Sequence, residues 1–138
     1  MPRKDLYHET VKIALEKDGW TVTHDPLYLE WDEAIYFPDL GAERVIAATK
    51  GTEKIAVEIK TFLGQVLQQD FYEALGQFDN YFYALAELEP DRNLVLAIPE
   101  KAYKEFFQKV YVQKVIKKKS IELLVYNIEN QTIAQWIK

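Results

Sequence analysis

The fold is decided by residues 37–62, which read FPDLGAERVIAATKGTEKIAVEIKTF. Two apolar runs, residues 43–49 and 54–61, are separated by a short polar segment in which Gly51 marks a tight turn. Short apolar runs joined in this way are typical of a β-hairpin. We therefore predict that the two runs pair as antiparallel strands of one central sheet.

The second of these strands carries two charged residues among apolar ones. Side chains alternate between the two faces of a strand, so Glu58 and Lys60 share one face while Ile59 points to the other. Asp39 precedes the first strand at a Pro-Asp turn, and hairpin pairing brings the start of the first strand close to the end of the second. The sequence therefore predicts that Asp39, Glu58 and Lys60 lie together.

These three residues have the chemistry of a magnesium-dependent hydrolytic site. Carboxylate oxygens are the ligands that Mg²⁺ or Mn²⁺ prefers, so Asp39 and Glu58 are candidate metal ligands, and we expect weak binding. Lys60 could orient an attacking water and offset the charge of a phosphate. The alternative is that Glu58 and Lys60 form the solvated face of an amphipathic strand.

The composition limits the classes of protein. The chain has 138 residues, 49% of them hydrophobic, which suits one domain with a substantial core. It has no cysteine, so disulfides and cysteine–zinc sites are excluded, and a cytoplasmic location is expected. No apolar run is long enough to span a membrane, and the first residues do not resemble a signal peptide. The formal net charge of -5 argues against non-specific, electrostatically driven binding of nucleic acid.

The remaining segments complete a mixed α/β pattern. Apolar spacings of three and four predict helices over 4–18, 66–88 and 99–117. Short strands are expected in WTVTHDP, LYLEW and NLVLAI, and in two runs of the C-terminal segment, joined by a turn near Glu129. The order of elements predicts a central sheet with helices packed on it, in one domain that spans residues 1–138.

The helix predicted over 66–88 adds two polar candidates. Gln77 and Tyr81 are four residues apart, so they lie on one face of the helix at the edge of its apolar stripe. They could steer a phosphate or a metal-bound water at the mouth of the strand site. The ordinary alternative is a surface glutamine and a half-buried tyrosine.

Three segments carry a resemblance to known proteins. PDL, AVEIK and QFDNY, placed in that order on a turn, a strand and a helix, resemble the PD-(D/E)XK nuclease pattern of the restriction-endonuclease-like fold. The Gln-x-x-x-Tyr element is similar to that of RecB-type exonucleases. Almost the whole chain resembles the XisH family of fdxN-element excision controlling factors, through KDLYHETVKIALEKDGWTVTHDPL, DLGAERVIAATKGTEKIAVEIKTF and ALGQFDNY.

The resemblance implies a fold, a set of roles and a process. The fold is a restriction-endonuclease-like mixed central β-sheet flanked by helices. Asp39 and Glu58 would be metal ligands, Lys60 the catalytic lysine, and Gln77 and Tyr81 accessory residues. The process is the programmed excision of a DNA element from a genome, alongside a site-specific recombinase.

Two further regions are candidates. In restriction-endonuclease-like folds an acidic residue of the first helix often reaches the metal, and Glu9 is the natural choice; an exposed helix glutamate is the alternative. His8 beside it is either a phosphate contact or a surface histidine. The run KVIKKK, which ends at Lys119, is the one basic cluster; it either contacts a DNA backbone or is the solvated end of a helix.

Three functions from different classes follow. The first is a Mg²⁺-dependent deoxyribonuclease or nuclease-like DNA-processing protein. The second is a non-catalytic regulatory subunit that keeps the nuclease fold and binds a partner protein or controls the recombinase. The third is a structural domain. We expect DNA to be bound with help from a protein partner, either the recombinase or a small companion factor. The high aromatic content, 14% of residues, also favours a homodimer or a heteromer.

Overall fold

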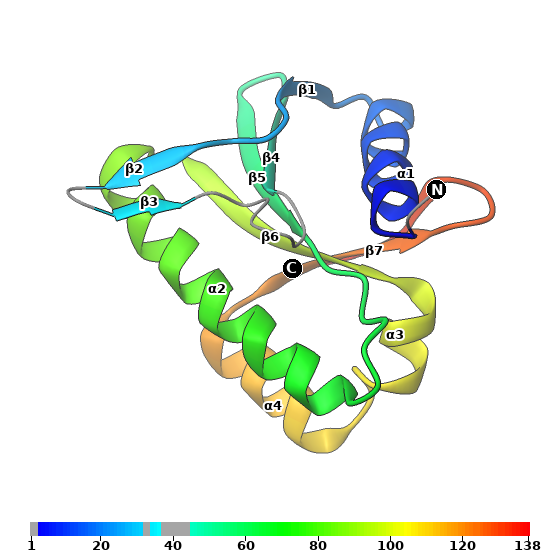
Figure 1. Ribbon diagram of the computed structural model, residues 1–138. Helices are drawn as coiled ribbons and strands as arrows, with labels where there is room; N and C mark the ends of the chain where they lie inside the picture. The colour runs from blue at the N-terminus through cyan, green and yellow to red at the C-terminus, as the bar shows by residue number, and fades with distance from the viewer. Residues whose placement is uncertain (1–2, 32–33, 37–44) are drawn as a thin grey trace.

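The computed structural model describes residues 3–31, 34–36 and 45–138. Within them one sheet runs in the order β1-β4-β5-β6-β7-β8, and a second sheet consists of β2 and β3 (Figure 1). The strands are β1 Thr21–His24, β2 Leu29–Trp31, β3 Ala34–Tyr36, β4 Val45–Lys50, β5 Glu53–Ile59, β6 Arg92–Pro99, β7 Glu122–Asn127 and β8 Thr132–Ile137. The helices are α1 Arg3–Lys17, α2 Leu67–Leu88, α3 Glu100–Glu105 and α4 Val110–Lys119. This is the mixed α/β sheet flanked by helices that the sequence predicts.

The β4–β5 hairpin confirms the first prediction. The two strands pair antiparallel, with Val45 opposite Glu58 and Lys50 opposite Glu53. Gly51 turns the chain with φ at +62°, a left-handed conformation that glycine adopts without a steric penalty. Local sequence is enough to specify this element, because the turn and both strands lie within 15 residues of one another.

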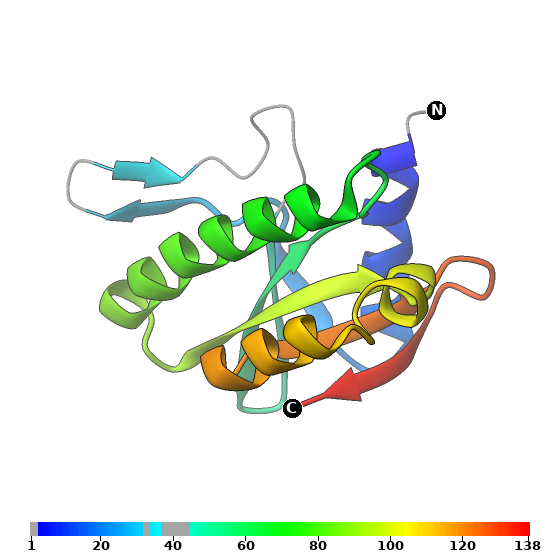
Figure 2. The same ribbon diagram turned by 90° about the horizontal axis from the view of Figure 1, so that it is seen from below.

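The middle of the sheet is parallel. β5 pairs with β6, and β6 with β7, in parallel register. Parallel neighbours need long connections. Here α2 makes the first connection, and α3 with α4 makes the second (Figure 2). The carboxyl ends of β5, β6 and β7 therefore point toward the same edge of the sheet.

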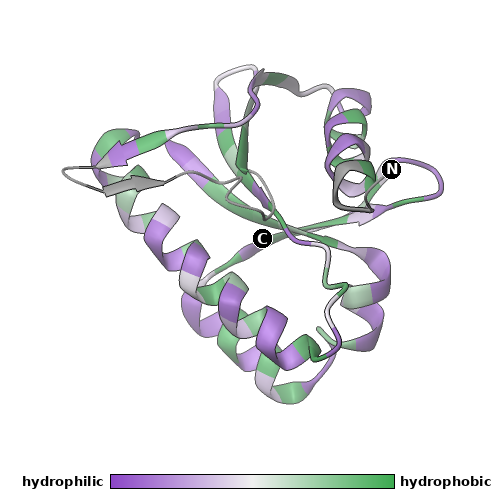
Figure 3. Cartoon of the chain, in the orientation of Figure 1, coloured by the Kyte–Doolittle hydropathy of each residue, from purple (hydrophilic) through white to green (hydrophobic). Residues whose placement is uncertain are grey.

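The alternation of side chains gives the sheet two apolar faces. Ala56 lies on the face that packs against α2, α3 and α4, where Phe71 and Phe78 are buried. Val57 lies on the other face, which packs against Val11 and Leu15 of α1. Figure 3 shows apolar and polar residues interspersed along α2, as expected of a helix that buries one face. The molecule thus has three layers, with α1 alone on one side of the sheet.

The prediction of one continuous helix over 99–117 is wrong, because the structure has two helices there. The chain forms α3, leaves the helical path at Phe106 to Lys109 and then begins α4. Phe106 and Phe107 are both buried, at 3% and 0% exposure. Adjacent residues on a straight helix point about 100° apart, so burying both rings in one core favours a break. The strand β3 also has no counterpart in the prediction.

A partly buried polar cluster links α1 to the segment after β1. His8 Nε2 lies 2.8 Å from Asp25 Oδ1, and Lys12 Nζ lies 2.9 Å from Asp25 Oδ2. Burial of Asp25 opposes its ionisation, but the hydrogen bonds from Lys12 and His8 outweigh burial and hold the pKa of this carboxyl below its usual value. The same hydrogen bond raises the pKa of Lys12. His8 is therefore a structural residue, 7% exposed, and the expectation of a surface histidine is wrong.

We expect Asp25→Asn to lower the free energy of unfolding at pH 7 by about 1.5–3 kcal/mol, the usual range for a hydrogen bond to a charged group. Because folding lowers the pKa of Asp25, its contribution is present above the ordinary value of 3.8 and is lost as the pH falls through the lower folded value. The difference from wild type should therefore shrink below about pH 4. Urea denaturation at several pH values measures it.

Asp91→Asn is the matched control for this prediction. Asp91 also pairs with a lysine, Lys54, at 3.0 Å, but its side chain is 64% exposed. Exposed ion pairs contribute little to stability. An equal loss of stability in both variants would show that the cluster of His8, Lys12 and Asp25 does not anchor α1.

Candidate functional site

Glu58 and Lys60 stand at the carboxyl end of β5, on the face that α2 covers. Glu58 is the residue opposite Val45 of β4 and Leu96 of β6, so it lies between two paired strands. Glu58 is 1% exposed and Lys60 is 7% exposed. Lys60 Nζ lies 4.0 Å from Glu58 Oε2. The prediction that both share one face is confirmed, but both are buried and do not stand on a solvated surface.

The helix α2 supplies a partner for this strand end. Lys60 Nζ donates a hydrogen bond to Gln77 Oε1. Gln77 is exposed, and Tyr81 is buried one turn further along α2 at 8% exposure. The structure thus brings Glu58, Lys60 and Gln77 together, with Tyr81 in the apolar core beside them.

The backbone of Lys60 is held by the neighbouring strands. Its amide donates to the carbonyl of Ala97 at 2.9 Å, which continues the β5–β6 pairing. The buried Tyr126 hydroxyl at the end of β7 donates to the Lys60 carbonyl at 3.0 Å. Sequence reasoning did not identify Tyr126, because the two residues are 66 apart and Tyr126 reads as an ordinary strand residue. These hydrogen bonds fix the position of the Lys60 backbone.

The chain turns sharply directly after Lys60. Phe62 has φ at +52°, in the left-handed region that costs about 1–2 kcal/mol for a residue with a side chain. Its ring packs edge to face on Phe107, with the centroids 5.2 Å apart. Burial of the ring offsets this strain. The turn takes the chain off the sheet toward the start of α2.

The metal ligands of the predicted site are only partly described. Asp39 lies outside the described residues. Glu9 is exposed on α1, which covers the opposite face of the sheet, so the structure does not place it beside Glu58. In the part of the chain that the structure describes, no three histidine, aspartate or glutamate side chains come together as a metal site.

The basic run ends α4. Lys117, Lys118 and Lys119 are exposed in the last turn, where cations interact favourably with the helix dipole. Lys119 Nζ lies 2.8 Å from Asp79 Oδ1 on α2. This ion pair accounts for one of the lysines as a link between two helices.

The helices in the described ranges include none that is long and apolar enough to cross a membrane.

Comparison with known proteins identifies relatives over nearly the whole chain. The family model described as XisH protein matches residues 1–134. A crystal structure of an XisH family protein from Nostoc punctiforme PCC 73102 is 42% identical, with a TM-score of 0.90, and the match covers 97% of this chain and 100% of that one. A crystal structure of an fdxN element excision controlling factor protein from Anabaena variabilis is 44% identical, with a TM-score of 0.89, covering 97% and 99% of the two chains. No protein with a curated description matches. The chain belongs to the XisH family.

Proposed function

We propose that this protein is a metal-dependent DNA-processing enzyme of the PD-(D/E)XK type that acts in the cytoplasm during excision of a DNA element. The observation that carries the proposal is that Glu58 and Lys60 lie next to each other at the end of β5. Lys60 is also hydrogen-bonded to Gln77 of α2. The relative from Anabaena variabilis is described as an excision controlling factor, and its 44% identity supports extending that process to this chain.

Each side chain has a chemical role in this proposal. Glu58 and Asp39 would hold Mg²⁺ or Mn²⁺, because paired carboxylates supply the oxygen ligands that these ions prefer. The ion would lower the pKa of a bound water and polarise the scissile phosphate. Lys60 would offset the negative charge that develops on the phosphate, and Gln77 would fix the direction of the Lys60 ammonium. Tyr81 would support Gln77 from the same helix.

The burial of the pair favours a second candidate function. Glu58 and Lys60 are almost fully covered, and the chain carries a net charge of -5, whereas DNA binding is favoured by a basic surface. A regulatory subunit that binds a partner protein or controls a recombinase could keep the nuclease fold without exposing this pair. Under this alternative, DNA affinity comes from the partner.

Metal binding tests the proposal. We expect millimolar Mg²⁺ or Mn²⁺ to raise the melting temperature of the wild-type protein by mass action. Glu58→Gln and Asp39→Asn should abolish that rise, because each removes a charged ligand. Glu53→Gln is the matched control, since Glu53 is an exposed acid on the same strand. Cleavage of linear and supercoiled DNA, followed on gels with and without metal, provides the second measurement.

The two candidate functions give different results. Metal-dependent cleavage that is lost in Glu58→Gln supports the enzyme. A melting temperature that neither ion moves, with intact DNA, contradicts it and leaves the regulatory subunit.

A further inference from the structure

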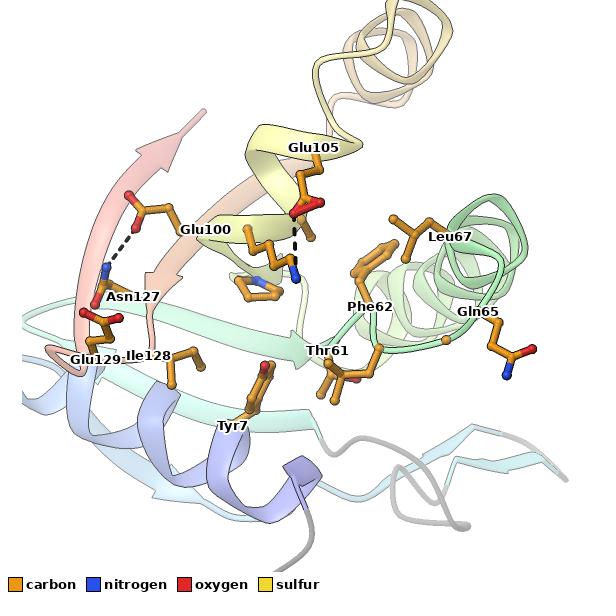
Figure 4. A pocket seen from close by; sticks show the side chains of 15 residues that line it. Tyr7, Thr61, Phe62, Gln65, Leu67, Glu100, Glu105, Asn127, Ile128 and Glu129 are labelled. Carbon is orange, nitrogen blue, oxygen red and sulfur yellow. Dashed lines mark hydrogen bonds and ion pairs between the residues drawn. The ribbon is translucent and has the colours of Figure 1, made fainter.

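A large hollow has neither Glu58 nor Lys60 in its lining. It is a cavity of about 850 Å³ at the edge of the sheet where β5, β6 and β7 end. The segments that follow these three strands line it, and Figure 4 shows residues of each around the cavity with the Tyr7 hydroxyl directed toward it from α1. Ligands often bind outside the carboxyl ends of parallel strands.

The cavity continues into a second hollow along the helices. This hollow of about 400 Å³ shares Gln65, Leu67 and Glu105 with the first. It ends at Lys109 and Tyr111, where α4 begins. Together the two hollows form one groove, which we call the α2–α3 groove. One wall is residues 61–68, and the other is residues 99–111 with the β7–β8 turn.

The middle of the α2–α3 groove is apolar. Phe62 and Phe106 contribute to its floor, and both rings belong to the buried core. Two apolar residues of its lining, Val66 and Leu63, are 57% and 40% exposed. Large apolar side chains gathered beside a groove are typical of a surface that contacts another protein.

The cavity end of the groove is acidic. Glu100, Glu105 and Glu129 line it against one basic residue, Lys101. Glu100 is held in place by Asn127, whose Nδ2 donates to Glu100 Oε1 at 2.8 Å. Lys101 Nζ lies 4.0 Å from Glu105 Oε2, and both side chains are more than half exposed, so this pair is screened by water. An excess of carboxylates repels the phosphates of nucleic acid and attracts cationic side chains.

We propose that the α2–α3 groove binds a peptide segment of a partner protein in which basic residues stand next to apolar ones. The apolar side chains would cover Leu63 and Val66. An arginine or lysine would lay its aliphatic stem on the apolar floor and direct its charge to Glu105, Glu100 and Glu129. This proposal does not rest on the nuclease chemistry, because no step at Glu58 or Lys60 enters it.

The test uses two labelled ten-residue peptides. One alternates leucine with arginine, and the other alternates leucine with glutamate. Fluorescence anisotropy with the full-length protein measures both affinities. We expect the basic peptide to bind at least about tenfold more tightly. The double variant Glu105→Gln/Glu129→Gln should weaken it by about fivefold, which is the effect of losing two exposed ion pairs.

The controls separate the groove from general attraction to an acidic protein. Glu73→Gln/Glu87→Gln removes the same charge from exposed positions on α2 and should leave the affinity unchanged. Val66→Ser, with all charges intact, should weaken both peptides because it removes an apolar contact. Equal binding of the two peptides, or equal weakening by both double variants, would overturn the proposal. Unchanged melting curves confirm that each variant is folded. Because none of these measurements contains a metal or a DNA substrate, their outcome is independent of the nuclease test.

Discussion

Phe71→Ala is expected to lower the free energy of unfolding by about 3–5 kcal/mol, the range for removing a buried aromatic ring. Phe71 is 0% exposed. Its ring packs edge to face against Phe106 and Phe107, with centroids 5.5 and 5.7 Å away. The cavity left by alanine would separate α2 from the segment between α3 and α4. Urea denaturation followed by circular dichroism measures the loss.

Tyr72→Ala is the matched control, because it removes an aromatic ring from the next position on the same helix. Tyr72 is 57% exposed, and its hydroxyl accepts a hydrogen bond from the exposed Gln68 side chain. Surface substitutions of this kind usually change stability by no more than about 0.5 kcal/mol. Comparable losses in the two variants would contradict the packing described for α2.

Under the proposed nuclease function, Lys60→Met should reduce metal-dependent DNA cleavage by at least about 100-fold, which is the usual contribution of a positioned catalytic side chain. Methionine keeps the unbranched shape and most of the length of the side chain but removes the ammonium and its hydrogen bond to Gln77. Lys54→Met is the control on the same strand, because Lys54 is a partly exposed lysine at the far end of β5. A folded Lys60→Met protein that cleaves DNA at the wild-type rate would exclude Lys60 from the chemistry.

A second variant keeps this result interpretable if Lys60→Met is unstable. Removing one member of a buried charged pair is strongly destabilising, because the other charge stays buried. Lys60→Met/Glu58→Gln removes both charges and should melt at a higher temperature than Lys60→Met alone. Recovery of folding without recovery of cleavage would show that the loss of activity is chemical.

The sequence predicts those parts of the fold that depend on neighbouring residues. The β4–β5 hairpin follows from its alternating pattern and Gly51, and α2 follows from apolar spacing over 22 residues. The break before α4 was not predicted, because it depends on how Phe106 and Phe107 fit a core made from distant segments. Periodicity reports which side chains are apolar, whereas the break depends on which of them are buried together.

The sequence likewise predicts only those features of the candidate site that depend on neighbouring residues or on the pattern of one element. Glu58 and Lys60 share a face because a strand alternates, and Gln77 reaches Lys60 because α2 packs on that face. The side on which α1 packs cannot be read from its own pattern, so the sequence did not show that Glu9 belongs to the opposite face. Tyr126 was not identified because its link to Lys60 depends on the order of three strands in the sheet.

The parallel arrangement of β5, β6 and β7 has a consequence for the time course of folding. The β4–β5 hairpin closes a very short loop, and hairpins of this kind form in about 1–10 μs. The hydrogen bond from Tyr126 to Lys60 closes a loop of 66 residues. It can form only when β6 lies in place between β5 and β7. Because the entropic penalty of closure rises with loop length, such non-local contacts form late. The backbone of Lys60 therefore gains its last hydrogen bond only when β7 docks, and a chain arrested before that step would carry a complete hairpin with the Lys60 carbonyl still unbound by Tyr126.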